Sequence, residues 1–140
     1  NLNMGFTTEV AANWDAINAV YENSIARIRK DFKHASDITM LGRHSSHSYL
    51  TGTNLYFVYD YNVVGCRPEE EREKYHVPIN AMIVEETLKL GGSMVHHHGI
   101  GKYRTRWTRE EHGSAYYILQ ALKDTYDPNG IMNPGTIFNE

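Results

Sequence analysis

Apolar residues recur at two different spacings along the chain, and each spacing predicts a different element. Between residues 13 and 32 they recur every three to four positions, which is typical of an amphipathic helix. The apolar positions of this segment are Trp14, Ile17, Tyr21, Ile28 and Phe32. Between residues 55 and 64 they alternate with polar ones, which indicates a strand with one buried face. The residues on that face are Leu55, Phe57, Tyr59, Tyr61 and Val63.

The remaining segments complete a mixed pattern. We expect a strand over 38–41, a helix from Pro78 that ends at Gly91–Gly92, a strand over 93–99, and a helix that Thr108 opens. Thr108 and Glu111 have the spacing of a capping box. The acidic run over 67–75 is typical of a solvated loop or helix start. This order, which includes a hairpin, predicts an α+β fold with helices packed on one face of an antiparallel sheet.

The bulk composition narrows the class of protein. The chain has 140 residues, 41% of them hydrophobic, so we expect one domain over 1–140. Its formal net charge of −3 argues against nucleic acid as a partner. The single cysteine, Cys66, excludes an internal disulfide and a cysteine-based zinc site. No apolar run reaches the roughly 20 residues of a membrane span. We expect a cytoplasmic protein, with peripheral membrane association left open.

Three adjacent histidines stand out in the segment "GGSMVHHHGIGKYR", residues 91–104. In an extended strand His96 and His98 would share a face, and His97 would point the other way. A zinc site would therefore need His44 or His47 as well. Proton transfer by one shielded imidazole, an anion site and a purely structural turn are the alternatives.

Two further groups have chemical potential. Tyr49 lies in a polar connection, where cationic neighbours such as Arg43 or His47 would lower the pKa of its phenol. Lys102, Arg104 and Arg106 alternate with neutral residues, so an extended chain would place them on one basic edge that suits an anionic ligand.

Three motifs, taken in order, resemble a known family. They are "HSSHSYLTGTNLYF", "GGSMVHHHGIGKYR" and "DPNGIMNPGTIF". Together they resemble the C-terminal half of FAD-linked oxidases of the vanillyl-alcohol oxidase type, and within that family the alkylglycerone-phosphate synthases most of all. The resemblance implies a ferredoxin-like cap domain. It also implies FAD, bound mainly by an N-terminal FAD-binding domain of the same polypeptide, so this chain would be an inactive fragment.

The resemblance also implies roles for individual residues. Tyr49 matches a catalytic base that takes a proton from the carbon beside a substrate carbonyl, and His97 matches a histidine that works with it. The other matched positions are expected to contact substrate or cofactor. They are His47, His96, His98, Lys102 and Arg104 for a small-molecule substrate, and His98 and Asn133 for FAD. Many relatives carry a glutamate where His97 stands and some hold a metal there, so we expect no metal in this chain.

Three functions remain open on this basis. The first is exchange of an acyl group for a fatty alcohol on dihydroxyacetone phosphate, as in the synthases. The second is FAD-dependent oxidation of a D-2-hydroxy acid. The third is a non-enzymatic domain whose histidines bind a metal or an anion. If the sheet is built against a flavin domain, its exposed apolar side chains would also favour self-association.

Overall fold

The computed structural model describes residues 2–138, which form two compact units. The first unit ends at His98 and the second begins at Gly99. No helix among the described residues is long and apolar enough to cross a membrane.

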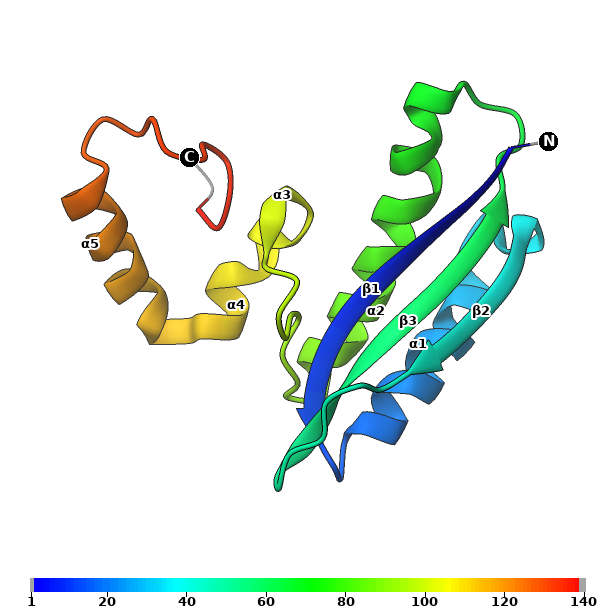
Figure 1. Ribbon diagram of the computed structural model, residues 1–140, viewed down its shortest axis with the longest axis horizontal. Helices are drawn as coiled ribbons and strands as arrows, with labels where there is room; N and C mark the ends of the chain where they lie inside the picture. Colours follow the sequence, from blue (N-terminus) through cyan, green and yellow to red (C-terminus); the bar gives the residue numbers. More distant parts are fainter. Residues whose placement is uncertain (1, 139–140) are drawn as a thin grey trace. The chain divides into compact units, whose positions relative to one another are not determined.

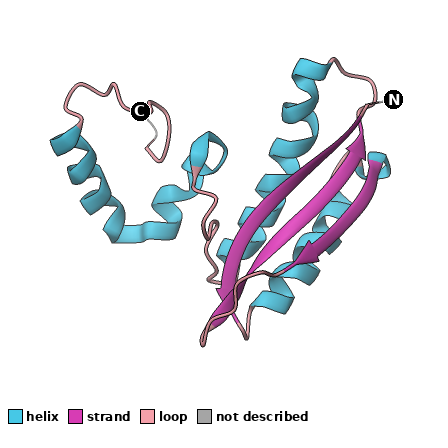
Figure 2. Ribbon diagram, viewed as in Figure 1, coloured by secondary structure: helices cyan, strands magenta, loops and turns pink. Residues whose placement is uncertain are grey.

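The first unit is a three-stranded antiparallel sheet covered by two helices (Figure 1). In chain order its elements are β1 (Asn3–Asn13), α1 (Ile17–Asp31), β2 (Ile38–His44), β3 (Gly52–Asn62) and α2 (Val77–Lys89). The strand order is β1-β3-β2, with the longest strands paired along their full length. Both helices lie on the same face of the sheet (Figure 2). The α+β prediction, with helices on one face, is confirmed.

The core lies between the sheet and the two helices. Leu55, Phe57, Tyr59 and Tyr61 are buried as their alternation predicted, and Val63 is half-buried just beyond the end of β3. Ile28 from α1, and Ile79 and Ile83 from α2, pack against this face and are fully buried. The opposite face of the sheet carries the other half of each strand's side chains, and we call it the open face.

Two strand predictions need correction. The N-terminal strand β1 was missed, although Met4, Phe6, Thr8 and Val10 alternate with polar residues. Conversely, residues 93–99 are not a strand. Only Ser93 pairs with β1, through Ala11, and the chain then leaves the sheet. Further along this segment, the backbone N–H groups of His97 and His98 donate to a side-chain carboxylate and not to a neighbouring strand.

The acidic run continues into α2. Pro68–Glu70 forms a 3-10 turn and Arg72–His76 a π-helical turn ahead of Val77. Glu71, Tyr75 and His76 are buried, so only part of this run is solvated. Gly91 has φ of +70°, which suits the glycine expected at the end of α2.

The second unit is built from short helices: α3 (Gly101–Arg104), α4 (Thr108–His112) and α5 (Tyr116–Tyr126). The predicted continuous helix from Thr108 is wrong, because Gly113 has φ of +51° and breaks it. The capping box is also absent, since the Thr108 hydroxyl is buried without a hydrogen-bond partner. Lys102 and Arg104 lie in α3, so they do not form an extended basic edge.

Candidate active site

A buried carboxylate, that of Glu9, lies at the centre of the candidate site. Glu9 pairs with Tyr56 across β1 and β3, so the two side chains lie on the same face of the sheet. That face is the open one, because the flanking residues Thr8 and Val10 are buried toward the helices. Glu9 is nevertheless 0% exposed. A charged side chain is almost never buried in this way unless it is paired.

Glu9 accepts hydrogen bonds through both of its oxygens. Oε2 accepts the backbone N–H groups of His97 at 3.0 Å and His98 at 3.3 Å. Oε1 accepts the side-chain amide of Asn54 at 2.9 Å and lies 2.9 Å from Nδ1 of His96 and 2.8 Å from Nδ1 of His97. Burial alone would raise the pKa of Glu9, but the hydrogen bonds from Asn54, His97 and His96 outweigh it and lower the pKa to about 2. Glu9 is therefore ionised at neutral pH.

Each of these imidazoles directs its other ring nitrogen to a tyrosine. Nε2 of His96 lies 2.8 Å from the hydroxyl of Tyr49, and Nε2 of His97 lies 2.8 Å from the hydroxyl of Tyr56. We call Glu9 together with these two histidines and two tyrosines the Glu9 network. The expectation that His97 points away from His96 is wrong, because their Nδ1 atoms lie only 2.8 Å apart. The strand alternation behind it does not apply to a segment that leaves the sheet.

Local backbone structure brings the two histidines onto the open face. Ser93 and Ala11 exchange two backbone hydrogen bonds, which fix the chain at Ser93, just before the histidines, against the free edge of β1. A Cβ atom on Gly92 would lie 2.7 Å from the Ala11 carbonyl oxygen, so glycine permits this close approach.

Tyr49 is held by the connection between β2 and β3. Its backbone N–H donates to the carbonyl of Gly52 at 2.8 Å, and its own carbonyl accepts the indole N–H of Trp14 at 2.9 Å. The Tyr49 side chain is 53% exposed, so its ring reaches solvent while its hydroxyl meets His96.

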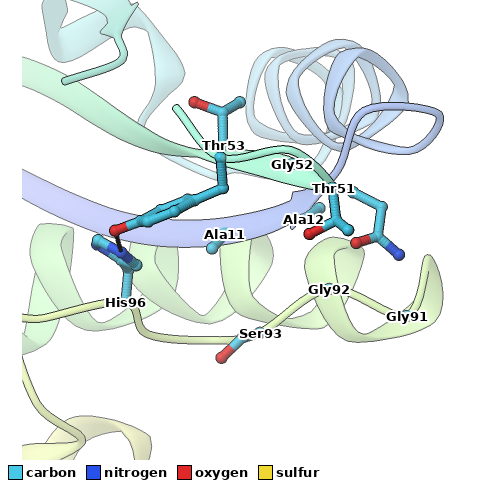
Figure 3. A pocket seen from close by; sticks show the side chains of 11 residues that line it. Ala11, Ala12, Thr51, Gly52, Thr53, Gly91, Gly92, Ser93 and His96 are labelled. Carbon is cyan, nitrogen blue, oxygen red and sulfur yellow. Dashed lines mark hydrogen bonds between the residues drawn. The ribbon is translucent and has the colours of Figure 1, made fainter. Parts of the chain in front are cut away.

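A pocket of about 250 Å³ adjoins Tyr49 and His96 (Figure 3). His96 lies at one end of the pocket and Gly91–Gly92 at the other. Alanine, glycine, serine and threonine residues form most of its wall, and among the described residues that line it there is no lysine or arginine. The pocket therefore suits a small or flat group that approaches the backbone closely, and its described lining offers a phosphate no lysine or arginine.

The other predicted histidines surround the Glu9 network. The His47 ring lies 5.1 Å from the rings of both His96 and His97, and the His98 ring lies 5.2 Å from that of Tyr56. His44 stacks on Tyr56 with ring centroids 4.4 Å apart. All five predicted site residues of the first unit thus converge; they are His47, Tyr49, His96, His97 and His98.

Two sets of described side chains lie close enough to share a divalent cation. One set is His47, His96 and His97, and the other is Glu9, His97 and His98. Hydrogen bonds already satisfy the Glu9 oxygens and both ring nitrogens of His96 and His97. The absence of a metal stays a prediction.

Three predicted residues belong to the second unit. Lys102 is exposed in α3, Arg104 is buried there, and Asn133 lies in the tail with φ of +48°. Their predicted contacts with substrate and FAD stay predictions.

Sequence reasoning missed Glu9, Asn54 and Tyr56. A signal for Glu9 was available, since it is a single charge within the run "FTTEVAA" of a strand. Tyr56 sits on the polar side of the alternation over 55–64, which is typical of a solvent-facing position. Neither signal reveals that His96, which lies 87 positions after Glu9 in the chain, returns to this face together with His97.

The fold and the site together define a class of protein: an α+β domain that presents paired imidazole and phenol groups around one buried carboxylate beside an open pocket. Residues 3–137 match the family of FAD linked oxidases, C-terminal domain. The chain belongs to this family.

Individual relatives refine the comparison. An uncharacterized FAD-linked oxidoreductase of Escherichia coli (strain K12), YgcU, is 66% identical over 136 residues, which are 97% of this chain and 28% of that protein. An alkyldihydroxyacetonephosphate synthase of Dictyostelium discoideum is 26% identical over 90% of this chain and 20% of its own length. A solved alkyldihydroxyacetonephosphate synthase structure has the same fold, with a TM-score of 0.53 at 19% identity, covering 94% of this chain and 19% of that one.

The chain spans only part of the length of these relatives. The chain spans about 28% of the length of the oxidoreductase that is 66% identical to it. The resemblance to the synthases holds at the level of the family and the fold, but at 26% identity it is far weaker than the match to the oxidoreductase.

The family implies FAD, and the donor set of the site fits one part of it. Imidazole and phenol groups beside a small-residue pocket suit the flat ring, whose edge carries hydrogen-bond acceptors. The same pocket lacks a cation for the phosphates, among its described residues. The residues present therefore fit the ring, and the described lining of the pocket offers the phosphates no lysine or arginine.

Proposed function

We propose that this chain supplies the acid–base groups of an FAD-dependent enzyme, with Tyr49 as the base. The observation that carries the proposal is the contact of the Tyr49 hydroxyl with Nε2 of His96, whose Nδ1 lies 2.9 Å from Glu9. A free tyrosine has a pKa of about 10 and is a poor base at neutral pH. A histidine that takes the phenol proton, and a carboxylate that stabilises the resulting imidazolium, together remove this difficulty.

The step itself is a proton transfer from carbon. The Tyr49 oxygen takes a proton from the carbon beside the substrate carbonyl, while its own proton moves to Nε2 of His96. Glu9 holds the ring in place through Nδ1. FAD, when bound, supplies the electron-accepting ring beside which this step occurs. His98 and Asn133 are the residues proposed to meet the cofactor, and His47 to meet the substrate.

The first candidate reaction is the exchange of a fatty acid for a fatty alcohol on acylated dihydroxyacetone phosphate, without net oxidation. The three motifs and the 26% identical synthase relative support it. In this reaction the alcohol oxygen replaces the carboxylate on the substrate carbon, and the proton that Tyr49 removes is returned. The phosphate would need cations outside the pocket, and we propose Lys102 and Arg104 for this role.

The second candidate is oxidation of a D-2-hydroxy acid by FAD. The pocket of about 250 Å³ is small, which suits a compact 2-hydroxy acid better than a substrate that carries both a long acyl chain and a phosphate. A mitochondrial D-lactate dehydrogenase [cytochrome] of Arabidopsis thaliana, 32% identical over 69 residues, is a relative with a name in this class. Here Tyr49 and His96 would remove the proton of the substrate hydroxyl as the carbon is oxidised.

We also propose that an FAD-binding domain of the same polypeptide is the partner of this chain. The longer relatives leave room for such a domain. The apolar side chains of α5 support it as well, because Ile118 is 66% and Leu122 50% exposed. A surface of this kind suits a protein partner, which includes a second copy of the chain.

The test uses the full-length protein that contains this chain. Tyr49→Phe should lower turnover by roughly 10²- to 10⁴-fold, the usual contribution of a general base, and leave flavin absorbance unchanged. The matched control is Tyr21→Phe, at a half-buried tyrosine outside the site. Assays with acylated dihydroxyacetone phosphate and with D-lactate separate the two candidate reactions. Full turnover in Tyr49→Phe would remove Tyr49 from the mechanism.

A further inference from the structure

Three atoms of the Glu9 network form a nearly equilateral triangle. Oε1 of Glu9 lies 2.9 Å from Nδ1 of His96 and 2.8 Å from Nδ1 of His97, and the two nitrogens lie 2.8 Å from each other. All three distances are within hydrogen-bonding range. The carboxylate can only accept, so the protons within the triangle must come from the imidazoles.

The triangle constrains where those protons lie. If both Nδ1 atoms carried a hydrogen directed at Oε1, the two hydrogens would be forced against each other. The strain is relieved when one Nδ1–H is shared between Oε1 and the lone pair of the other Nδ1. Because a neutral imidazole carries one proton, the two rings are then in opposite tautomers.

Opposite tautomers make the two tyrosines different. The ring protonated at Nδ1 accepts the hydroxyl proton of its tyrosine at Nε2, which leaves the phenol oxygen able to take a proton from substrate. The other ring is protonated at Nε2 and donates to its tyrosine, whose own O–H is then available for a substrate oxygen. The two hydroxyl contacts, both 2.8 Å, are compatible with either assignment.

We propose that Tyr56, through His97, is a second acid–base group of this site, and that Glu9 couples it to the Tyr49–His96 pair. The inference rests on the proposed function of Tyr49 and extends it. One tyrosine takes a proton from the substrate carbon while the other gives a proton to the substrate carbonyl oxygen. Glu9 acts as a positioning residue, since its role is to hold the two imidazoles and the backbone that carries them.

The proton transfers balance without an external reactant. Tyr49 takes the proton of the C–H bond and passes its own to Nε2 of His96, while the C–H electron pair forms the carbon–carbon double bond of an enol. Tyr56 gives its proton to the carbonyl oxygen and regains one from Nε2 of His97. The bridging proton moves from Nδ1 of His96 to Nδ1 of His97. The two rings have then exchanged tautomers, which prepares the reverse transfer.

Other titratable groups face this network and bear on its pH dependence. His47 lies against both rings from the connection after β2, and His44 stacks on Tyr56 from β2. His98 follows on the same segment and meets the Tyr56 ring. Because these three imidazoles also face the network, a tautomer measurement at one fixed pH is the more direct test.

The first experiment measures the tautomers in the full-length protein with nitrogen-15-labelled histidine. NMR should find one ring of the His96–His97 pair protonated at Nδ1 and the other at Nε2. In Glu9→Gln this pairing should be lost, whereas Glu22→Gln, at an exposed glutamate, should leave it intact. The same tautomer for both rings in the unaltered protein would overturn the coupling.

The second experiment is kinetic and uses the substrate that turns over, acylated dihydroxyacetone phosphate or D-lactate. Tyr56→Phe keeps the ring that His44 and His98 contact and removes only the hydroxyl. It should lower kcat by roughly 10²-fold or more, with a smaller effect on KM, and remove one limb of the pH profile. Combining it with Tyr49→Phe should cost little more than either change alone, because the pair acts as a unit.

The outcomes separate this inference from the proposed function. An inactive Tyr49→Phe beside a Tyr56→Phe protein with unaltered kcat and pH profile would refute the second acid–base group and leave Tyr49 as the base. Unaltered activity in both variants would refute both. Loss of activity in both, with opposite tautomers in the unaltered protein, supports the coupled pair.

Discussion

The protonation of the Glu9 carboxylate contributes to the pH dependence of the stability of the chain. Replacing Glu9 by glutamine should remove this contribution. Folding lowers the pKa of Glu9 from 4.5 to about 2, since burial, which alone would raise it, is outweighed by the hydrogen bonds from Asn54, His97 and His96. The unfolded chain therefore binds this proton more readily than the folded one. The stabilisation is complete above about pH 4.5 and is lost as the pH falls toward 2.

The size of the effect follows from the same shift. A change of one pKa unit corresponds to about 1.4 kcal/mol, so ionised Glu9 contributes about 3 kcal/mol to the free energy of unfolding at neutral pH. Glutamine has the same shape but no charge, and it cannot ionise. We expect Glu9→Gln to be about 3 kcal/mol less stable than the unaltered chain at pH 7 and equally stable near pH 2.

Urea denaturation at a series of pH values measures this difference. Trp14 donates its indole N–H to the Tyr49 carbonyl and so reports on the first unit. A Trp107→Phe background leaves Trp14 as the only tryptophan. Glu22→Gln, in the same background, should run parallel to the unaltered chain. If the curves of the unaltered chain and of Glu9→Gln stay equally far apart from pH 7 to pH 2, packing and not charge sets the cost.

Three further predictions concern the frame of the site. Gly52→Ala should clearly lower the melting temperature measured by calorimetry, because the new Cβ would lie 2.2 Å from the Ala12 carbonyl oxygen. The control Gly42→Ala should change it little, because its Cβ would meet only the Met40 sulfur at 3.6 Å. Arg27→Ala, which removes ion pairs to Glu85 at 2.6 Å and to its neighbour, should cost about 1 kcal/mol at low salt and less at high salt, as urea denaturation at the two salt concentrations would measure. Dialysis of the full-length protein against a chelator should leave turnover unchanged; a stoichiometric metal found by elemental analysis, with activity lost on its removal, would contradict the expectation of no metal.

The sequence predicts the core of this fold well because burial alternates with chain position. Phe57, Tyr59 and Tyr61 are fully buried on the face that their spacing assigns to the core. The same periodicity locates both long helices, although α1 begins at Ile17 and leaves Trp14 exposed. These are local patterns, and a local pattern needs no knowledge of which segments meet.

The site depends on which segments meet, and the spacing of its residues carries no such information. The alternation rule assigns His96 and His97 to opposite faces, but it holds only while a strand stays paired. Here pairing ends at Ser93, and the backbone N–H groups that follow turn to Glu9. The error about the histidines and the omission of Glu9 thus have one cause. The carboxylate of Glu9 accepts the backbone N–H groups that a neighbouring strand would otherwise bind, and Glu9 lies in β1, a strand that was not predicted.

The two oxygens of Glu9 have different partners. Oε2 receives the backbone N–H groups of His97 and His98, which is sufficient to fix the segment. Oε1 faces the ring nitrogens, and a purely structural anchor would not need two imidazoles that each end on a phenol. Glutamine can keep its oxygen on the backbone donors and turn its NH₂ group toward the rings. The Glu9→Gln protein should therefore hold residues 96–98 in place and lose the ring tautomers, which separates the anchoring of the segment from its chemistry.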